Sequence, residues 1–184
     1  MGITGASGSI YALRLLQVLA EKKECKVHCV ISKHGIEVLK YETGVEVNSL
    51  SCYVKRLYNV HDMAASIASG SFPMDAMVIL PCSMRTLASV ANGVSDNLLL
   101  RAADVTIKEG RLLVLGVRET PLSPIHLQNM LRLSQIGVRI APLCPSFYHI
   151  PQTLEDLVDM MVGRICDTLR ISTDLFKRWK SDPE

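Results

Sequence analysis

The chain has 184 residues, of which 48% are hydrophobic and 21% are charged, so it can bury a core of ordinary size and is not disordered in composition. Its 20 basic and 18 acidic residues give a net charge of +2, and only 5% of its residues are aromatic. This balance argues against nucleic acid or an anionic membrane as the partner. No apolar run reaches the roughly 18 residues of a membrane span, and the N-terminus lacks a signal-peptide pattern, so we expect a cytoplasmic protein.

Hydrophobic periodicity predicts strands and helices that alternate along the chain. Strands are expected where aliphatic residues run continuously, and helices where apolar residues recur at spacings of three and four. The predicted strands are Met1–Thr4, Lys26–Ile31, Asp75–Leu80 (closed by Pro81), Arg111–Val117 and Val138–Ala141. The predicted helices are Ser9–Lys22, Ser32–Glu42, Met84–Asn92, Asp96–Glu109, Pro124–Ile136 and a C-terminal helix with its tail over about 153–184, marked by Leu154, Val158, Met161 and Ile165.

Apolar strands separated by helices are typical of a parallel sheet that is covered on both faces. We therefore expect a three-layer, doubly wound α/β fold of the Rossmann or flavodoxin-like type, with 1–184 as a single domain. In such sheets, ligands bind beyond the carboxyl ends of the strands. The functional residues are therefore sought in the loops that follow the strands.

The first of these loops, "TGASGS" at Thr4–Ser9, has the composition of an anion cradle. Gly5 and Gly8 allow close backbone approach, and the next helix offers unpaired N–H groups and the positive end of its dipole. The loop is neither the GxGxxG dinucleotide fingerprint nor a P-loop. An ordinary strand-to-helix turn is the alternative interpretation.

A second loop, "PCSMRT" at Pro81–Thr86, has the same design. Ser83 can cap the following helix, Thr86 lies one turn inside it, and Arg85 adds a positive charge. A simple capped helix is again the alternative. Two such loops at one sheet edge favour a ligand that carries a phosphate and a ring system.

Further along the chain, Arg118 and Glu119 follow a buried strand, where an arginine can grip a phosphate and a carboxylate can move a proton. A solvated surface ion pair is the alternative. Lys108, Tyr148 and Arg164 could hold a second phosphate, or each could serve packing, surface or helix-end roles.

The six cysteines are scattered and form no CxxC pair, so we expect reduced, mostly packed thiols and no metal site.

With these loops in view, the chain resembles the UbiX-type flavin prenyltransferases. The stretches that carry the resemblance are "TGASGSIYALRLL", "ISKHG", "ASGSF", "PCSMRTLASVANGVSDNLLLRAADV", "LVLGVRETPLSPIHLQNMLRLSQIG" and "PSFYHIPQTLEDLVDMMVGRICDTL". The resemblance implies a flavodoxin-like homo-oligomer, typically a dodecamer, that binds FMN where subunits meet. It implies that a dimethylallyl group passes from dimethylallyl monophosphate to N5 and C6 of reduced FMN without a metal. The prenylated FMN would then serve a UbiD-type decarboxylase.

The resemblance also implies roles for individual residues. The implied FMN contacts are Gly5, Ala6, Ser7, Ser32, Ser83, Met84, Arg85, Thr86, Arg101 and Arg118. The implied prenyl-phosphate ligands are Lys108, Tyr148 and Arg164, and the implied catalytic residues are Glu119, Lys108, Glu42 and Tyr148. Glu42 matches an acidic residue that the family contributes from a neighbouring subunit, and Glu119 would handle protons. The chain departs from the family pattern in its short first strand and in Gly110, where relatives often have a second basic residue.

Two other functions remain open at this point. A cysteine-type FMN-dependent decarboxylase of the same superfamily relies on an early histidine, and His34 is available for that role. A non-catalytic FMN-binding subunit of a decarboxylase would bind flavin without turnover. An NAD-dependent oxidoreductase is disfavoured because its glycine fingerprint is missing.

Overall fold

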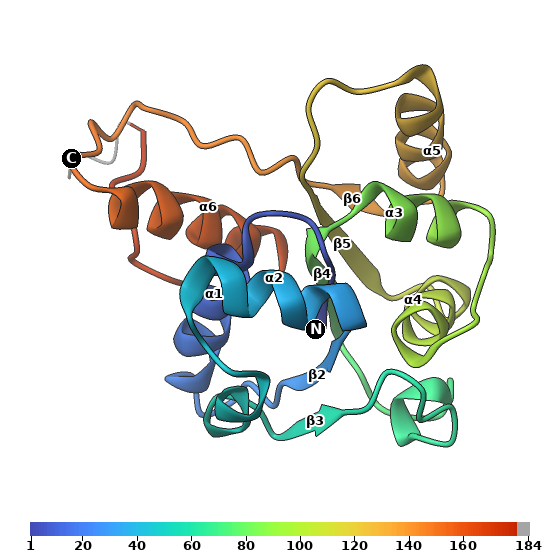
Figure 1. Cartoon of the computed structure of the whole chain (residues 1–184). Coiled ribbons are helices and arrows are strands. Elements are labelled where there is room, and N and C mark those ends of the chain that lie inside the picture. Colours follow the sequence, from blue (N-terminus) through green and yellow to red (C-terminus); the bar gives the residue numbers. More distant parts are fainter. Residues whose placement is uncertain (180–184) are drawn as a thin grey trace.

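The computed structural model describes residues 1–179, and its strands form one six-stranded parallel sheet (Figure 1). The strands are β1 (Gly2–Ile3), β2 (His28–Ile31), β3 (Arg56–Tyr58), β4 (Ala76–Cys82), β5 (Leu112–Val117) and β6 (Arg139–Ile140). The helices are α1 (Ser9–Ala20), α2 (Lys33–Thr43), α3 (Met84–Ala91), α4 (Leu98–Lys108), α5 (Pro124–Gln135) and α6 (Leu154–Thr168). Two short 3-10 turns, η1 (Val47–Cys52) and η2 (Ser66–Ala68), complete these elements.

The strand order is β3-β2-β1-β4-β5-β6, and every neighbouring pair is parallel. The chain therefore builds outward from β1 to β3, then crosses back to β4 and builds outward in the other direction. The loops after β1 and β4 diverge at this reversal, which is where doubly wound sheets bind ligands. The predicted doubly wound α/β fold is confirmed.

Alternating side chains on the strands build a core on each face of the sheet. On β4, Met77 and Ile79 pack in one cluster with α3 and α4, whereas Val78 and Leu80 pack in another with α1 and α6. A third cluster joins β1, β2, α1 and α2 around Ile3. Thus α1, α2 and α6 cover one face, and α3 and α4 cover the other.

Two strands differ from the sequence prediction. The edge strand β3 is missed because it has three residues, of which Tyr58 alone is buried, so it contains no continuous apolar run. The strand expected to close at Leu80 continues through Pro81 to Cys82. Although Pro81 has no N–H, its carbonyl accepts from the Thr4 N–H at 3.2 Å, and Cys82 still pairs with Val117.

The remaining predicted helices and strands are present, with boundaries shifted by a few residues. The C-terminal helix is α6, while residues 180–184 of its expected tail lie outside the described residues. No helix in the described range has the length and apolar character that crossing a bilayer requires.

The expectation of mostly packed thiols holds for half of the cysteines. All six are free; Cys29, Cys82 and Cys166 are buried, whereas Cys52 and Cys144 are exposed. Burial raises the pKa of the Cys29 and Cys166 thiols to about 11, which keeps both neutral at physiological pH.

Candidate functional site

One buried hydroxyl ties the carboxyl ends of β1 and β4 together. Thr4 Oγ1 donates to the Pro81 carbonyl at 2.8 Å and accepts from the Ser83 N–H at 2.9 Å. The residue is only 1% exposed, so these bonds are shielded from water. Thr4 thereby fixes the loop after β4 relative to the loop after β1. Sequence reasoning assigned Thr4 no role, and the available signal was a small hydroxyl residue at the very end of a buried strand.

The loop after β4 starts helix α3 with a side-chain cap. Ser83 Oγ accepts from the Thr86 N–H at 3.3 Å and lies 3.1 Å from Thr86 Oγ1. Met84 and the exposed Arg85 occupy the first turn between them. Burial raises the pKa of the adjacent Cys82 thiol to about 12, so this cysteine is no nucleophile. The loop therefore offers hydroxyls, helix N–H groups and one cation.

The loop after β1 already holds an anion at the start of α1. The Glu42 carboxylate accepts from the Gly8 N–H at 2.9 Å and from the Ser9 N–H at 2.8 Å. Gly8 has a φ of 110°, a left-handed conformation that glycine adopts at no steric cost. The predicted cradle thus binds negative charge through backbone N–H groups, as a helix N-terminus does. Glu42 makes these bonds within its own chain, and its role at a neighbour's flavin stays a prediction.

The loop after β2 lies against the same cradle. Ser32 caps α2 by accepting from the Gly35 N–H at 3.0 Å. A Cβ on Gly5 would lie 2.6 Å from the Cβ of His34, so the close approach of these two loops requires glycine at position 5. His34 Nδ1 lies 2.9 Å from the Glu37 carboxylate, and this pair is exposed beside the loop.

The loop after β5 brings a guanidinium and a carboxylate to the same edge of the sheet. Arg118 Nη1 and Glu119 Oε1 lie 3.9 Å apart, and that carboxylate oxygen also accepts from the Thr120 N–H at 3.0 Å. Both side chains are somewhat more than one third exposed. Within the described residues, Arg118 Nε and Ser9 Oγ are buried with no hydrogen-bond partner. The Arg118 side chain is partly exposed, so its unsatisfied guanidinium can donate to a polar ligand at this edge of the sheet.

These four loops bring together most of the sequence-predicted flavin contacts. Gly5 and Ser7 are exposed and Ala6 is buried after β1, while Ser32, Ser83–Thr86 and Arg118 follow β2, β4 and β5. Arg101 is the exception, because it lies on α4, donates to the Ala68 carbonyl at 3.2 Å and pairs with Asp104 at 2.7 Å. Its predicted phosphate contact is not part of this cluster within one chain.

The three predicted prenyl-phosphate residues are not brought together within one chain. Lys108 ends α4 and pairs with Glu109, which lowers the pKa of the Glu109 carboxyl. Arg164 lies on α6 at the other face of the sheet, where it bonds Asp167 at 3.0 Å. Tyr148, in the loop before α6, packs edge-on to Trp179. A common phosphate site for these residues therefore needs more than one copy of the chain.

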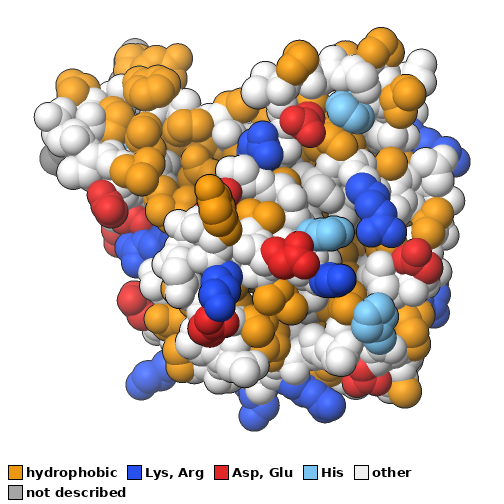
Figure 2. Space-filling model, in the orientation of Figure 1, with side chains coloured by type: hydrophobic (Ala, Val, Ile, Leu, Met, Phe, Trp, Pro, Cys, Tyr) orange, Lys and Arg blue, Asp and Glu red, His pale blue; other side chains and the backbone are white. Residues whose placement is uncertain are grey.

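The loop before α6 and the first turn of α5 expose large apolar side chains. Phe147, Tyr148 and Ile150 in the loop and Ile125 on α5 are each more than two thirds exposed. Figure 2 shows hydrophobic side chains gathered over the upper left lobe, and a notch that separates this lobe from α5. Exposed apolar side chains that gather in this way on the lobe around Phe147 mark an interaction surface.

Residues 1–166 match the model of the Flavoprotein family. The chain belongs to this family. All sequence-predicted site residues of this flavoprotein, from Gly5 to Arg164, lie within the matched range.

Individual relatives extend the likeness over nearly the whole flavoprotein. Flavin prenyltransferase LpdB from Lactiplantibacillus plantarum is 46% identical over 182 residues, which are 99% of this chain and 97% of LpdB. A dodecameric FMN-dependent UbiX-like decarboxylase from Escherichia coli O157:H7 has a TM-score of 0.96 at 43% identity, covering 98% of this chain and 97% of that one. AnUbiX (PadA1), in complex with FMN and dimethylallyl pyrophosphate, has a TM-score of 0.94 at 41% identity, covering 99% and 96%. The predicted resemblance to the UbiX-type flavin prenyltransferases is confirmed.

Proposed function

We propose that the chain is a flavin prenyltransferase that joins the dimethylallyl group of dimethylallyl monophosphate to N5 and C6 of reduced FMN. The observation that carries the proposal is the cluster of anion-binding loops after β1, β2, β4 and β5 in a chain 46% identical to a flavin prenyltransferase over 99% of its length. The structural likeness to AnUbiX, whose complex contains FMN and dimethylallyl pyrophosphate, supports FMN and a phosphorylated dimethylallyl donor as the ligands. Residues 1–184 would act as one domain, and the cytoplasmic location stays a prediction.

FMN fits the cluster of strand-end loops. The residues that would hold it are Gly5, Ala6, Ser7, Ser32, Ser83, Met84, Arg85, Thr86 and Arg118, with Arg101 supplied by a neighbouring copy. The partly exposed Arg118, whose Nε has no hydrogen-bond partner among the described residues, supplies a donor for a polar ligand. Reduced FMN, when bound, supplies the nucleophilic N5 and C6 positions. The chain's part is to orient the ring and keep water away from it.

The prenyl phosphate would be held by Lys108, Tyr148 and Arg164 from different copies. Their positive charges and phenol would stabilise the phosphate as negative charge develops on it during C–O bond cleavage. Assembly would also displace the present partners of these side chains, Glu109 and Asp167. The dodecameric UbiX-like neighbour and the exposed apolar lobe around Phe147 support a homo-oligomer, which we take to be a dodecamer.

Glu119 would handle the proton that leaves C6 when the carbon–carbon bond at C6 forms and closes the new ring. Its carboxylate accepts a hydrogen bond from the Thr120 N–H at one oxygen, and the side chain is partly exposed at the edge of the sheet where the ring would lie. Glu42 would act from a neighbouring subunit, as the family resemblance implies. The product would be transferred to a UbiD-type decarboxylase.

The decisive experiment is a mass spectrum of the flavin released after the protein is incubated with FMN, a reductant and dimethylallyl monophosphate. A flavin heavier by one prenyl unit supports the proposal. Unmodified FMN that co-purifies with the protein would instead support a non-catalytic FMN-binding subunit. Oxidative decarboxylation of a peptide with a C-terminal cysteine, without flavin prenylation, would support the cysteine-type decarboxylase. Replacing the monophosphate with the diphosphate in a parallel reaction identifies the preferred donor.

A further inference from the structure

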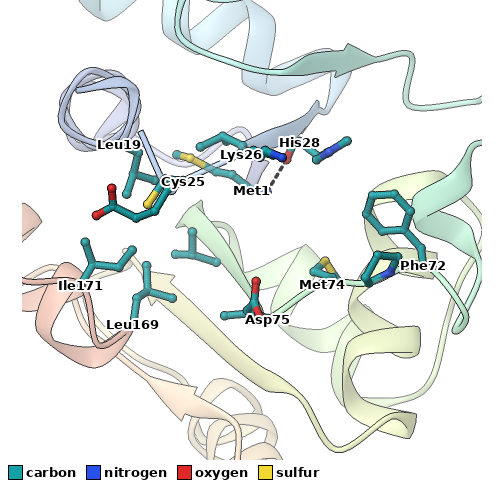
Figure 3. A pocket seen from close by; sticks show the side chains of 15 residues that line it. Met1, Leu19, Cys25, Lys26, His28, Phe72, Met74, Asp75, Leu169 and Ile171 are labelled. Atoms are coloured by element: carbon teal, nitrogen blue, oxygen red, sulfur yellow. Dashed lines mark hydrogen bonds between the residues drawn. The ribbon is translucent and has the colours of Figure 1, made fainter. Parts of the chain in front are cut away.

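A short loop, Ala68–Ser71, lies against the end of helix α4. The loop turns sharply, because the Phe72 N–H donates to the Ser69 carbonyl at 3.2 Å. On either side of the turn, Ala68 and Phe72 pack against the hydrophobic cluster of α3 and α4. Phe72 also packs edge-on against His28, with ring centroids 5.1 Å apart, in the pocket that Figure 3 shows. Both ends of the loop are therefore anchored in the core.

Two arginine side chains hold the backbone carbonyls of this loop. Arg101 Nε on α4 donates to the Ala68 carbonyl at 3.2 Å, and Arg111 Nη2 donates to the Gly70 carbonyl at 2.7 Å. Arg111 stands between the end of α4 and the start of β5, so its side chain connects the loop to the turn that joins these two elements. The bond from Arg111 therefore fixes Gly70 relative to the end of α4.

The position of the Arg111 side chain costs free energy. Its Nη1 is buried and has no hydrogen-bond partner among residues 1–179. A buried donor without an acceptor is destabilising, and an apolar side chain at this position would avoid that cost. Such an unsatisfied group calls for an explanation other than packing. The group that Arg111 does hold is the Gly70 carbonyl, so the explanation is sought at Gly70.

The ion pair between Lys108 and Glu109 lies directly on Gly70. A Cβ on Gly70 would lie 2.7 Å from the Lys108 Nζ and closer still to a Glu109 carboxylate oxygen. The φ of Gly70 is outside the left-handed region, so glycine is needed here for space and not for backbone conformation. The hydrogen bond from Lys108 and, to a smaller extent, the charge of Arg111 lower the pKa of the Glu109 carboxyl. Both cations therefore lie near this carboxylate.

A side chain at position 70 would displace the Lys108 ammonium. Non-bonded heavy atoms pack at about 3.5–4 Å, so a methyl group that starts 2.7 Å from Nζ would move this atom by roughly 1 Å. The lysine and glutamate side chains can adjust at their ends, so the fold should tolerate the change. A misplacement of about 1 Å in a group that orients the substrate can lower the rate by about a hundredfold.

We propose that Arg111 and Gly70 are positioning residues for Lys108. Arg111 fixes the Gly70 carbonyl, and the absence of a side chain on Gly70 sets the place of the Lys108 ammonium. Both roles rest on the proposed function, in which Lys108 binds the phosphate of dimethylallyl monophosphate. Arg111 and Gly70 act through Lys108 and not on the reacting atoms. The loop thereby gives a long and flexible lysine side chain a defined position.

The test is calorimetric titration of the full-length protein, loaded with oxidised FMN, with dimethylallyl monophosphate. Oxidised flavin prevents prenyl transfer, so affinity is measured without turnover. Gly70→Ala should weaken the affinity for the monophosphate about tenfold, and Arg111→Met, which loses the donor but keeps an apolar stem, about threefold to tenfold. FMN affinity should not change in either variant. The control Arg132→Met also removes one charge and one hydrogen bond, to the Asn92 side chain at 3.2 Å, and should change neither affinity.

A double-mutant cycle separates positioning from general damage. In a Lys108→Met background, Gly70→Ala should not weaken the monophosphate affinity further, because the ammonium that it would displace is gone. An equal loss in both backgrounds would overturn the proposal, and parental affinity in Gly70→Ala or Arg111→Met would overturn the role of that residue.

The same titration distinguishes this proposal from the proposed function. A parent protein that binds no monophosphate would overturn both. A parent protein that binds it but forms no prenylated flavin after reduction would overturn the proposed function alone, and the binding data would still decide whether Arg111 and Gly70 position Lys108.

Discussion

Replacing Thr4 by valine tests how the two flavin loops are held together. Valine keeps the branched shape of threonine but removes the oxygen that accepts from the Ser83 N–H and donates to the Pro81 carbonyl. The Pro81 carbonyl keeps its bond from the Thr4 N–H, whereas the bond from the Ser83 N–H to Oγ1 is lost. Leaving one donor unsatisfied in a largely buried place costs about 1–3 kcal/mol, so the free energy of unfolding should fall by about that amount.

The same change should weaken FMN binding. Ser83 caps α3 and belongs to the proposed flavin contacts, and Thr4 sets its backbone position. If one hydrogen bond to the flavin is misaligned, affinity should fall by roughly threefold to tenfold, in line with a net bond strength of about 1 kcal/mol. Urea unfolding measures the first effect, and quenching of FMN fluorescence on binding measures the second.

Thr106→Val is a matched control for this experiment. Thr106 is also fully buried, but its hydroxyl donates to the Ala102 carbonyl inside α4, away from the flavin loops. Its removal leaves no N–H without an acceptor, so the loss of stability should be smaller and FMN affinity should not change. If Thr4→Val and Thr106→Val have the same FMN affinity, Thr4 does not position the site and the reasoning is refuted.

Three other changes test separate parts of the structure. Glu119→Gln should keep FMN affinity, while prenylated flavin forms at least about a hundredfold more slowly. The control Glu155→Gln, on the exposed start of α6, should change neither property. A parental rate of prenylation in Glu119→Gln would contradict the proton role of Glu119. Bulky apolar residues at both Ser83 and Thr86 should abolish FMN binding, measured by flavin retention during gel filtration, and retained flavin would exclude this loop from the site. Backbone N–H groups ahead of α6 hydrogen-bond to the Asp156 carboxylate and lower its pKa. The ionised carboxylate therefore stabilises the fold above its ordinary pKa of about 4, and this contribution disappears as the pH falls through the lowered pKa. The difference in unfolding free energy between the parent and Asp156→Asn should therefore shrink on acidification, and a difference that is constant with pH would contradict this cause.

The sequence predicted the fold well because burial in a doubly wound sheet leaves a strong local signal. Strands β4 and β5 are continuous apolar runs, and the helices that follow carry apolar residues at spacings of three and four. Strand β3 lacks that signal because it lies at the sheet edge with Arg56 exposed. The cap at Ser83 was also predictable, because a serine directly before a predicted helix commonly accepts a hydrogen bond from a backbone N–H of the first turn.

Contacts between residues far apart in the sequence were beyond this kind of reasoning. Thr4 and Ser83 are 79 positions apart, and Glu42 lies 34 positions from Gly8, so no local period connects them. The residues themselves left Lys108 and Arg164 open between a second phosphate site and ordinary packing or surface roles, and only the family resemblance favoured the phosphate. The helices that carry Lys108 and Arg164 lie on opposite faces of the sheet, so no local sequence pattern connects the two residues. A site that is completed between copies leaves its residues in each chain with only ordinary surface partners.

The contact between Glu42 and the loop after β1 connects these observations. Within one chain, its carboxylate occupies the N–H groups of Gly8 and Ser9, which are the groups best suited to bind an anion. The resemblance assigns the same residue to a neighbour's flavin. Both positions are compatible if the carboxylate lies where two copies meet, because a group bonded to one loop can still face the ligand of the adjoining copy. The cradle would then be held in shape by Glu42 through its backbone, and the phosphate would bind through the hydroxyls of Ser7, Ser32 and Ser83 and the charge of Arg118.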